Sequence, residues 1–287
     1  MKFITQVIDY LALRYLAYRG LQHLRSGFPP IASFAFDHIG HEINLKGRYE
    51  AADLDATVQF LRESGLLNGI AVDVGANIGN HSVFFARHFK RVLALEPNPR
   101  VFDLLSFNTE PHDNIQLLNI GASDMEGEQA LSFDPENWGG AHLLAAGAAE
   151  QVSATSVTVQ LRTLDDLEEL SSSRVGLLKV DVEGHELRVL KGAAKLLTRS
   201  HPVILFEQHA DEIAQGSSAV VDWLRDNGYR QFLEVRSFPG VPRSWKMPGR
   251  KILNGLLRIV AGERKKVVLV ERFEKVFYPM IIALPSR

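Results

Sequence analysis

The segment that most constrains this chain is IAVDVGANIGN, residues 70–80. Apolar residues surround one acid, Asp73, and a turn with two glycines leads into a helical pattern. This order predicts a buried strand and a tight turn, because Gly75 can adopt backbone angles closed to other residues and Gly79 permits close approach. The following helix would direct its free N–H groups toward a ligand over the turn. A plain strand-to-helix connection is the alternative.

Apolar strand-like runs alternate with helix-like runs along the chain. The expected strands cover residues 70–74, 92–95, 115–119, 177–182 and 203–206, and the expected helices cover residues 53–63, 80–89, 99–108, 164–170, 186–198 and 218–226. Such alternation is typical of a parallel sheet with helices on both faces. We therefore predict an α/β, doubly wound, mostly parallel sheet, with its core at residues 51–240.

Three regions depart from this alternation. Residues 1–50 predict a helix over 3–25 and then a hairpin over 34–49. Residues 127–161 read either as an insertion over the carboxyl ends of the strands or as a surface loop. The last segment, 241–287, predicts a basic amphipathic helix and, in YPMIIALP, a late strand inserted into the sheet.

Composition excludes several classes of protein. The chain has no cysteine, which excludes disulfides, thiolate metal sites and cysteine nucleophiles and fits a reducing cytoplasm. The formal net charge of −2 gives no global field that would favour nucleic acid. No apolar run is long enough to cross a bilayer, and the N-terminus lacks a signal-peptide pattern. We expect a cytoplasmic protein without a nucleic-acid partner.

Two segments nevertheless suggest surfaces for a partner. The helix over residues 3–25 would pack on the main domain, form a homo-oligomer with a second subunit, or lie on a membrane. Between residues 243 and 266 there are eight Lys or Arg against one acid, which suits anionic lipid, an acidic substrate or a solvated face. Peripheral contact at the inner membrane surface is therefore one of the alternatives.

A second acid narrows the ligand. Glu96 ends the expected second strand, 23 residues after Asp73, and its carboxylate could accept both hydroxyl protons of a ribose. Pro97 would keep that edge rigid. The turn reads G-A-N-I-G, so it lacks both the G-x-G-x-x-G dinucleotide pattern and a Walker lysine. Asp73 would serve the cationic amino-acid end of a cofactor or brace the turn, which suits S-adenosylmethionine better than a nicotinamide.

Five motifs then occur in a characteristic order: DVGANIGNHSVFFA, LEPNP, TLDDL, KVDVEGHELRVLKGA and PVILFEQ. Over residues 49–208 the chain resembles the FkbM-type family of S-adenosylmethionine-dependent methyltransferases. The resemblance implies a class I methyltransferase fold, with a seven-stranded sheet whose last strand is antiparallel. It also implies methyl transfer to a hydroxyl, often on a sugar or secondary metabolite. The N-terminal helix and the basic C-terminal segment lie outside it.

The resemblance also assigns the cofactor contacts. The methionine end of the cofactor would be wrapped by Gly75, Ala76, Asn77 and Gly79, with Asn80 and His81 at the helix start. Glu96, beside Pro97, would hold the ribose. The adenine would be bordered by Gly121, Ala122 and Ser123, where Ser123 also reads as part of an ordinary turn.

The fourth strand ends in DVEGHE, close to the expected methyl donor. Strand alternation places Asp181 and Glu183 on one side, with Asp181 bounding the donor end. Glu183 or His185 would take the proton from the acceptor hydroxyl, because a sugar hydroxyl is a weak acid. The alternative is that His185 and Glu186 simply begin a helix.

The fifth strand ends in Glu207-Gln208-His209 at the same edge. A divalent cation could be held by Asp181, Glu183, Glu207 and His209, although no spacing requires one and a metal is not favoured. For the acceptor pocket, the candidates are Tyr49, Glu50, Trp138 and His209. A core tyrosine and a loop-packing tryptophan are the alternatives.

We therefore predict an S-adenosylmethionine-dependent O-methyltransferase that acts on a sugar, a glycolipid or polysaccharide, or a secondary metabolite. Two rivals remain at this stage. One is a nicotinamide-dependent Rossmann oxidoreductase, which needs a glycine pattern that is missing here. The other is a membrane-associated protein that binds the cofactor without turnover, which the acids Asp73, Glu96, Asp181 and Glu183 argue against.

Overall fold

The computed structural model describes residues 2–134, 137–143, 156–241 and 249–286. The helices are α1 (Lys2–Arg25), α2 (His38–Lys46), α3 (Ala51–Glu63), α4 (Asn80–Phe85), α5 (Pro99–Thr109), α6 (Glu168–Ser171), α7 (Glu186–Lys191), α8 (Ala194–Ser200), α9 (Ala219–Asp226) and α10 (Arg250–Ala261). The strands are β1 (Ile70–Val74), β2 (Val92–Leu95), β3 (Ile115–Leu118), β4 (Gly121–Ala122), β5 (Gly127–Asp134), β6 (Asn137–Leu143), β7 (Ser156–Arg162), β8 (Val175–Val180), β9 (Val203–Gln208), β10 (Tyr229–Phe238), β11 (Arg264–Leu269) and β12 (Tyr278–Pro285).

The main sheet confirms the predicted α/β class. Its strand order is β11-β10-β12-β9-β8-β1-β2-β3, and the five strands from β9 to β3 pair in parallel. The last strand, β12, is antiparallel and inserts between β9 and β10, as YPMIIALP suggested. The sheet has eight strands instead of the expected seven, because β11 adds antiparallel to β10. Its residues Arg264, Lys265 and Lys266 are the kind of charged side chains that suit an edge strand.

Two apolar layers cover the sheet, one on each face. Along β1, Val72 and Val74 pack in the layer of α7, α8 and α9, whereas Ala71 packs with α3 and α4. All residues of β1, β2 and β8 are buried, as expected for central parallel strands. Because helices cover both faces of the sheet, a ligand can reach these strands only at their ends. The main pocket lies at the carboxyl ends.

The predicted hairpin over residues 34–49 is wrong, because this segment forms the helix α2. The Asp37 side chain accepts a hydrogen bond from the Ile39 N–H and caps the helix start. Gly47, with φ of 87°, ends it in the left-handed region. Ile39 and Ile43 are buried and stand four residues apart, so they lie on one face of the helix. The short alternating segments around them had indicated strands instead.

The expected helix over residues 186–198 is divided into α7 and α8. The break falls at Gly192, where an added Cβ would lie 1.9 Å from the Ser123 carbonyl oxygen. Only glycine permits this approach between the helix and the segment after β4.

The insertion contributes strands to a second sheet, of order β4-β7-β5-β6 among the described residues. Residues 135–136 and 144–155 of the insertion lie outside the described part of the chain. Leu131, in β5, lines the main pocket at the carboxyl ends of the parallel strands, so the insertion reaches the site instead of lying apart as a surface loop.

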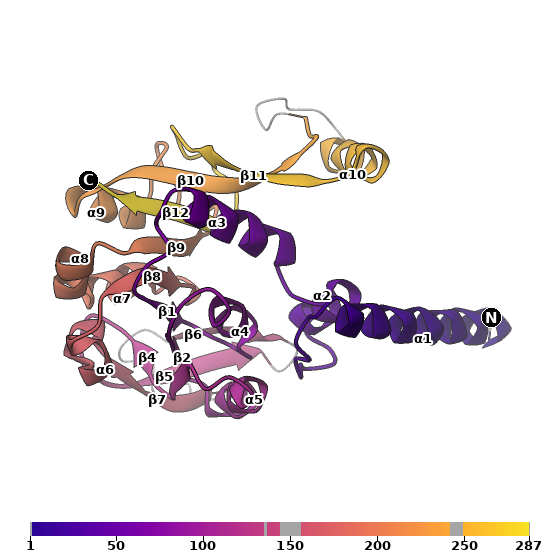
Figure 1. Ribbon diagram of the computed structural model, residues 1–287, viewed down its shortest axis with the longest axis horizontal. Helices are drawn as coiled ribbons and strands as arrows, with labels where there is room; N and C mark the ends of the chain where they lie inside the picture. Colours follow the sequence, from indigo (N-terminus) through magenta and orange to yellow (C-terminus); the bar gives the residue numbers. More distant parts are fainter. Residues whose placement is uncertain (1, 135–136, 144–155, 242–248, 287) are drawn as a thin grey trace.

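The N-terminal helix α1 projects from the rest of the chain, toward the right in Figure 1. The predicted basic amphipathic helix is present as α10. Searching the described residues finds no helix long and apolar enough to cross a membrane.

Candidate functional site

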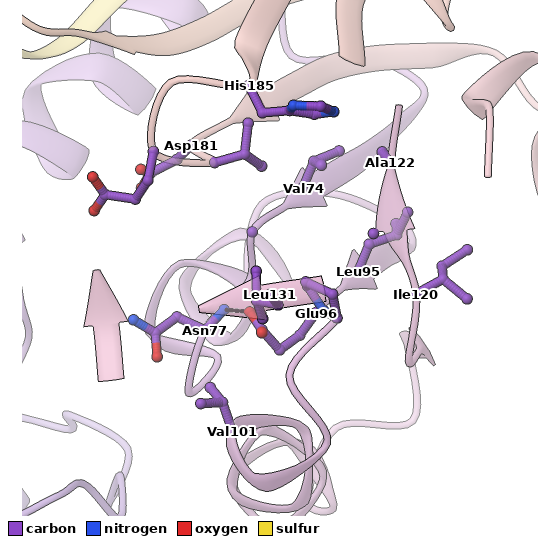
Figure 2. Close-up of a pocket in the computed structure, with 15 residues that line it drawn as sticks. Val74, Asn77, Leu95, Glu96, Val101, Ile120, Ala122, Leu131, Asp181 and His185 are labelled. Atoms are coloured by element: carbon purple, nitrogen blue, oxygen red, sulfur yellow. Dashed lines mark hydrogen bonds between the residues drawn. The ribbon is translucent and has the colours of Figure 1, made fainter. Parts of the chain in front are cut away.

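The main pocket opens where β1, β2 and β8 end (Figure 2). Its empty volume, with the open solvent at its mouth, is about 710 Å³. It is lined by Val74, Gly75, Asn77, Leu95, Glu96, Pro97, Val101, Ile120, Gly121, Ala122, Leu131, Asp181, Val182, Glu183 and His185. Most of the residues that the sequence assigned to the cofactor therefore surround one space.

The two glycines of the turn have separate roles. Gly75 has φ of 76°, and an added Cβ would lie 1.9 Å from the backbone oxygen of Asp181. It therefore holds the ends of β1 and β8 together. Gly79, with φ of 90°, precedes α4, and its missing Cβ leaves room for Leu105 of α5. The close approach predicted at Gly79 is thus to a neighbouring helix.

Glu96 lies at the end of β2 and is 7% exposed. Its two carboxylate oxygens accept hydrogen bonds from backbone N–H groups, at 3.0 Å from Asn77 and 2.8 Å from Asn98. Burial raises the pKa of Glu96 to about 7, against the lowering effect of these bonds. Each oxygen has a second lone pair, so the carboxylate can still accept from a ligand.

Asp73 does not line the pocket, because its fully buried carboxylate is occupied inside the sheet. It accepts from Ser82 Oγ at 2.6 Å and pairs with Lys179 Nζ at 3.0 Å. Lys179 Nζ also lies 3.2 Å from Asp181 Oδ2 and 3.2 Å from the Gly75 carbonyl oxygen. Of the two roles considered for Asp73, the geometry favours bracing of the turn.

Sequence reasoning missed Lys179. Burial alone would lower its pKa, but the charges of Asp73 and Asp181 outweigh burial and raise it, so the ammonium group stays protonated. The available signal was a lone cation inside the otherwise apolar strand VGLLKV, since lysine is rarely fully buried without a partner.

The side of the pocket expected for adenine is largely apolar. It is lined by Leu95, Ile120, Ala122 and Leu131. His185 lies across the pocket from Glu96 (Figure 2), and its Nε2 atom is 2.9 Å from Ser123 Oγ. Burial, with the nearby charge of Arg188, lowers the pKa of His185. His185 therefore lies in this wall, bonded to Ser123.

Carboxylates gather at the opposite end, around His209. Its Nε2 atom lies 2.8 Å from Glu207 Oε1 and 3.5 Å from Glu183 Oε2. Burial, followed by the charges of Asp181 and Glu183, raises the pKa of Glu207 to about 9. Ligand atoms of Glu183, Glu207 and His209 all lie within 4.8 Å of one another, whereas Asp181 pairs with Lys179.

The N-terminal segment closes this end through Tyr49 and Glu50. Asn80 accepts from the Tyr49 N–H at 3.0 Å and donates to the Tyr49 carbonyl at 3.1 Å. Its amide is therefore bonded to the chain, whereas His81 Nε2 lies 3.3 Å from Glu50 Oε2. A smaller pocket of about 210 Å³ is lined by Glu50, His81, Lys179, Val180, Asp181, Leu205, Phe206, Glu207, Pro279 and Met280.

Trp138 lies in β6, but its side chain is outside the part of the chain that the structure describes. Its assignment to the acceptor pocket stays a prediction.

The pocket fits a nucleoside-containing cofactor. Its single buried acid, Glu96, stands at the end of the second parallel strand, where an open sheet binds a ribose. Asn77, with φ of 51°, adds a buried side-chain oxygen that has no hydrogen-bond partner among the described residues. The apolar wall suits a purine ring.

Comparisons with known proteins identify the family. Residues 73–231 match the model of the methyltransferase FkbM domain, so the chain belongs to this family. The hexuronic acid methyltransferase AglP of Haloferax volcanii is 34% identical over 157 residues, which are 53% of this chain and 61% of AglP. The methyltransferase sdnD of Sordaria araneosa is 33% identical over 156 residues, 44% of this chain and 60% of sdnD.

The chain thus spans about three fifths of the length of these curated relatives. Among solved structures, an FkbM methyltransferase from Methylobacillus flagellatus has 17% identity and a TM-score of 0.34, covering 66% of this chain and 48% of that one. These comparisons add no support for the divalent cation considered from the sequence.

Proposed function

We propose that this protein is an S-adenosylmethionine-dependent O-methyltransferase that methylates a hydroxyl group of a sugar or glycan. Three observations support the proposal: membership of the FkbM methyltransferase family, the nucleoside-type pocket around Glu96, and the carboxylate and imidazole groups at its far end. The name of the relative AglP refers to a hexuronic acid, which is a sugar acceptor.

The chain's own residues would hold the cofactor in three places. The Glu96 carboxylate accepts hydrogen bonds from the ribose hydroxyls, and the free Asn77 oxygen accepts a further one. The apolar wall with Leu95, Ile120 and Leu131 takes the purine. When bound, S-adenosylmethionine supplies a methyl group already activated on a sulfonium, so the protein mainly aligns the acceptor.

Glu183 is the residue that carries the proposal for catalysis. It is the one member of the Glu183–Glu207–His209 cluster that also lines the cofactor pocket. Its φ of 52° places a non-glycine residue in the left-handed region, a strain that proteins tolerate mainly at functional positions. We assign the Glu183 carboxylate as acceptor of the hydroxyl proton, with His209 between it and Glu207 as the positioning residue.

The charge of this end favours an acceptor that is neutral near the reacting hydroxyl. Glu50, Asp181 and Glu183 lie around it, whereas Glu207 keeps its proton because its pKa is raised to about 9, and the buried cation Lys179 is already held by Asp73 and Asp181. A second negative charge brought here would be repelled at low effective dielectric. A uronic acid would therefore bind with its own carboxylate directed away from the cluster.

The test is transfer of labelled methyl from S-adenosylmethionine to paired acceptors, with mass analysis of the product. Neutral glycosides and their uronic acid counterparts form the pairs, and we expect the neutral member to be methylated faster. Failure of every hydroxyl acceptor would contradict O-methylation, and a consistent preference for the uronic acid would contradict the charge argument.

Glu183→Gln tests the assigned base. The amide keeps the size of the side chain but cannot take the proton, so we expect kcat to fall about 100-fold while affinity for S-adenosylhomocysteine stays unchanged. His185→Asn is the matched control, because His185 lies in the adenine wall, and its effect on kcat should be much smaller. A larger loss of kcat in His185→Asn than in Glu183→Gln would indicate that His185 is the base.

Binding separates the proposal from a nicotinamide enzyme. S-adenosylhomocysteine should raise the melting temperature of the protein, and NAD should leave it unchanged. If NAD raised the melting temperature and S-adenosylhomocysteine did not, S-adenosylmethionine would not be the cofactor.

A further inference from the structure

Helix α1 has no buried residue over its 24 positions. The side-chain hydrogen bonds described between α1 and α2 lie near the C-terminal end of α1. Arg19 Nε donates to the Leu45 carbonyl at 2.8 Å, and His23 Nε2 lies 3.1 Å from the Asn44 carbonyl. The outer turns extend into solvent (Figure 1). A helix held in this way cannot derive its stability from packing on its own chain.

The apolar side chains of α1 surround the whole helix. Ile8, Leu13 and Leu21 are 59%, 68% and 56% exposed. At about 100° per residue they point in three directions that together divide the circumference. A second copy of the helix would cover one stripe and leave the others in water. A lipid leaflet would cover all of them.

The charges of α1 suit an anionic lipid surface. The helix carries Lys2, Arg14, Arg19 and Arg25 against a single acid, Asp9. Tyr15 and Tyr18 lie toward its attached half and are 53% and 56% exposed. Tyrosine and the long basic side chains are the residues that favour the headgroup region of a bilayer.

Helix α10 presents a second surface of the same kind. Ile252, Leu256 and Val260 follow one another at intervals of four residues and are 71%, 55% and 87% exposed. They therefore form one apolar row in a segment, residues 243–266, that has eight Lys or Arg and one acid. In Figure 1, α10 lies on the side of the molecule from which α1 projects.

We infer that α1 and the apolar row of α10 insert together into one leaflet of an anionic bilayer, whose headgroups meet the Lys and Arg side chains of α1. The inference concerns docking of the whole protein and is independent of the proposed methyl transfer. Its partner is a lipid surface, because only a lipid phase matches both the apolar circumference of α1 and the excess of positive charge.

The experiment is flotation of the full chain, without cofactor, on vesicles of phosphatidylcholine with phosphatidylglycerol and on vesicles of phosphatidylcholine alone. We expect at least about tenfold stronger binding to the anionic vesicles, reduced by added salt. Absence of binding to both vesicle types would overturn the inference.

Variants then locate the contact. Ile8→Ser/Leu13→Ser/Leu21→Ser should weaken vesicle binding about 100-fold, and Ile252→Ser/Leu256→Ser/Val260→Ser should weaken it about tenfold or more. Phe107→Ser/Met125→Ser is the matched control, since these side chains are 64% and 58% exposed in other parts of the chain, on α5 and between β4 and β5. An equal loss in the control variant would overturn the assignment, as would an α1 variant that only converts an oligomer to a monomer.

A local probe distinguishes contact from altered folding. Because the natural chain has no cysteine, Leu11→Cys, Val260→Cys and Phe107→Cys can each carry one polarity-sensitive fluorophore. We expect anionic vesicles to shift emission to the blue at Leu11 and Val260 and to leave it unchanged at Phe107. No shift at Leu11 would overturn the inference, whatever the flotation result.

Discussion

The two ends of the site differ in the chemistry of the side chains that line them. At the proposed cofactor end, a single buried acid, Glu96, is held by two backbone N–H groups within largely apolar walls. At the proposed acceptor end, Glu183 and Glu207 lie close to His209, with Asp181 and Glu50 nearby. The first end needs one acceptor in a fixed place, which backbone geometry supplies.

The second end depends on pH, because burial and, after it, repulsion between like charges raise the pKa of one of its carboxylates. Glu207 keeps its proton to a pKa of about 9, whereas Glu96 titrates at about 7. The contrast teaches that one site can combine a preformed ligand cradle with a proton-holding cluster. Lys179 is the link between them, because it pairs with Asp73 beneath the turn and with Asp181 beside the cluster.

Removing this link should have the largest effect. Lys179→Met leaves the fully buried Asp73 carboxylate without its cation, so we expect the free energy of unfolding to fall by about 3–5 kcal/mol. Urea unfolding measures the change. Lys191→Met, at an exposed position, is the control and should cost little. Equal costs would mean that Lys179 does not connect the two ends.

Gly75→Ala should damage the cofactor end next most severely. The new Cβ would meet the Asp181 backbone oxygen, which cannot move aside as a side chain would, so we expect a loss of about 3 kcal/mol in stability together with loss of S-adenosylhomocysteine binding. Calorimetry measures both. Gly184→Ala shares the positive φ but meets no atom within 4 Å, and should cost only about 1 kcal/mol. If Gly75→Ala changed neither stability nor binding, the backbone of the turn would be able to move away from the new Cβ, and the prediction would be wrong.

Replacement of Glu96 tests whether the cofactor end depends on one acceptor. Glu96→Ala should weaken S-adenosylhomocysteine binding about 100-fold, and Glu96→Gln, which retains one carbonyl oxygen, about tenfold. Titration calorimetry ranks the three proteins. If both variants bind as the natural chain does, the ribose is not held at Glu96.

A pH series should produce the smallest but most specific effect. Because the pKa of Glu96 is raised to about 7, its carboxyl is protonated below that pH and loses acceptor strength. We expect affinity for S-adenosylhomocysteine to fall by about tenfold from pH 8 to pH 6, with no such change in Glu96→Gln. Turnover should continue to rise toward pH 9 as Glu207 loses its proton. If binding and turnover changed with the same midpoint pH, the two ends would not titrate separately.

The same raised pKa fixes the sign of a stability effect. The folded chain holds the Glu96 proton to higher pH than the unfolded chain, so this group favours the folded state least above about pH 7. Its contribution to the free energy of unfolding should decrease as pH rises from about 4.5 to 7 and should be absent from Glu96→Gln.

The sequence predicted well the strands beside the main pocket and the residues that follow them, because the constraints on these segments are local. β1 and β2 have the expected bounds, since each is a short apolar run that ends at an acid or a glycine turn. Gly75 and Glu96 follow these strands directly, so the strand ends place them together. Neither placement needs knowledge of distant contacts.

The failures share a non-local cause. Residues 38–46 form a helix because buried contacts of Ile39 and Ile43 outweigh the glycine signals that suggested a hairpin. The break at Gly192 depends on Ser123, and the role of Lys179 depends on Asp73, each far away in sequence. His185, considered as a base because of its place after the fourth strand, bonds to Ser123, whereas His209 joins the carboxylates, and the role of His185 as a base stays a prediction.

The paired hydrogen bonds between Asn80 and Tyr49 have one further consequence. They fasten the segment that leads from α1 and α2 to the first turn of α4, beside the cofactor cradle. A chain docked through α1 would therefore keep the mouth of its pocket at one height above the lipid headgroups. An acceptor must then present its hydroxyl at that height, so the length of the carrier beneath the sugar would select substrates alongside their chemistry.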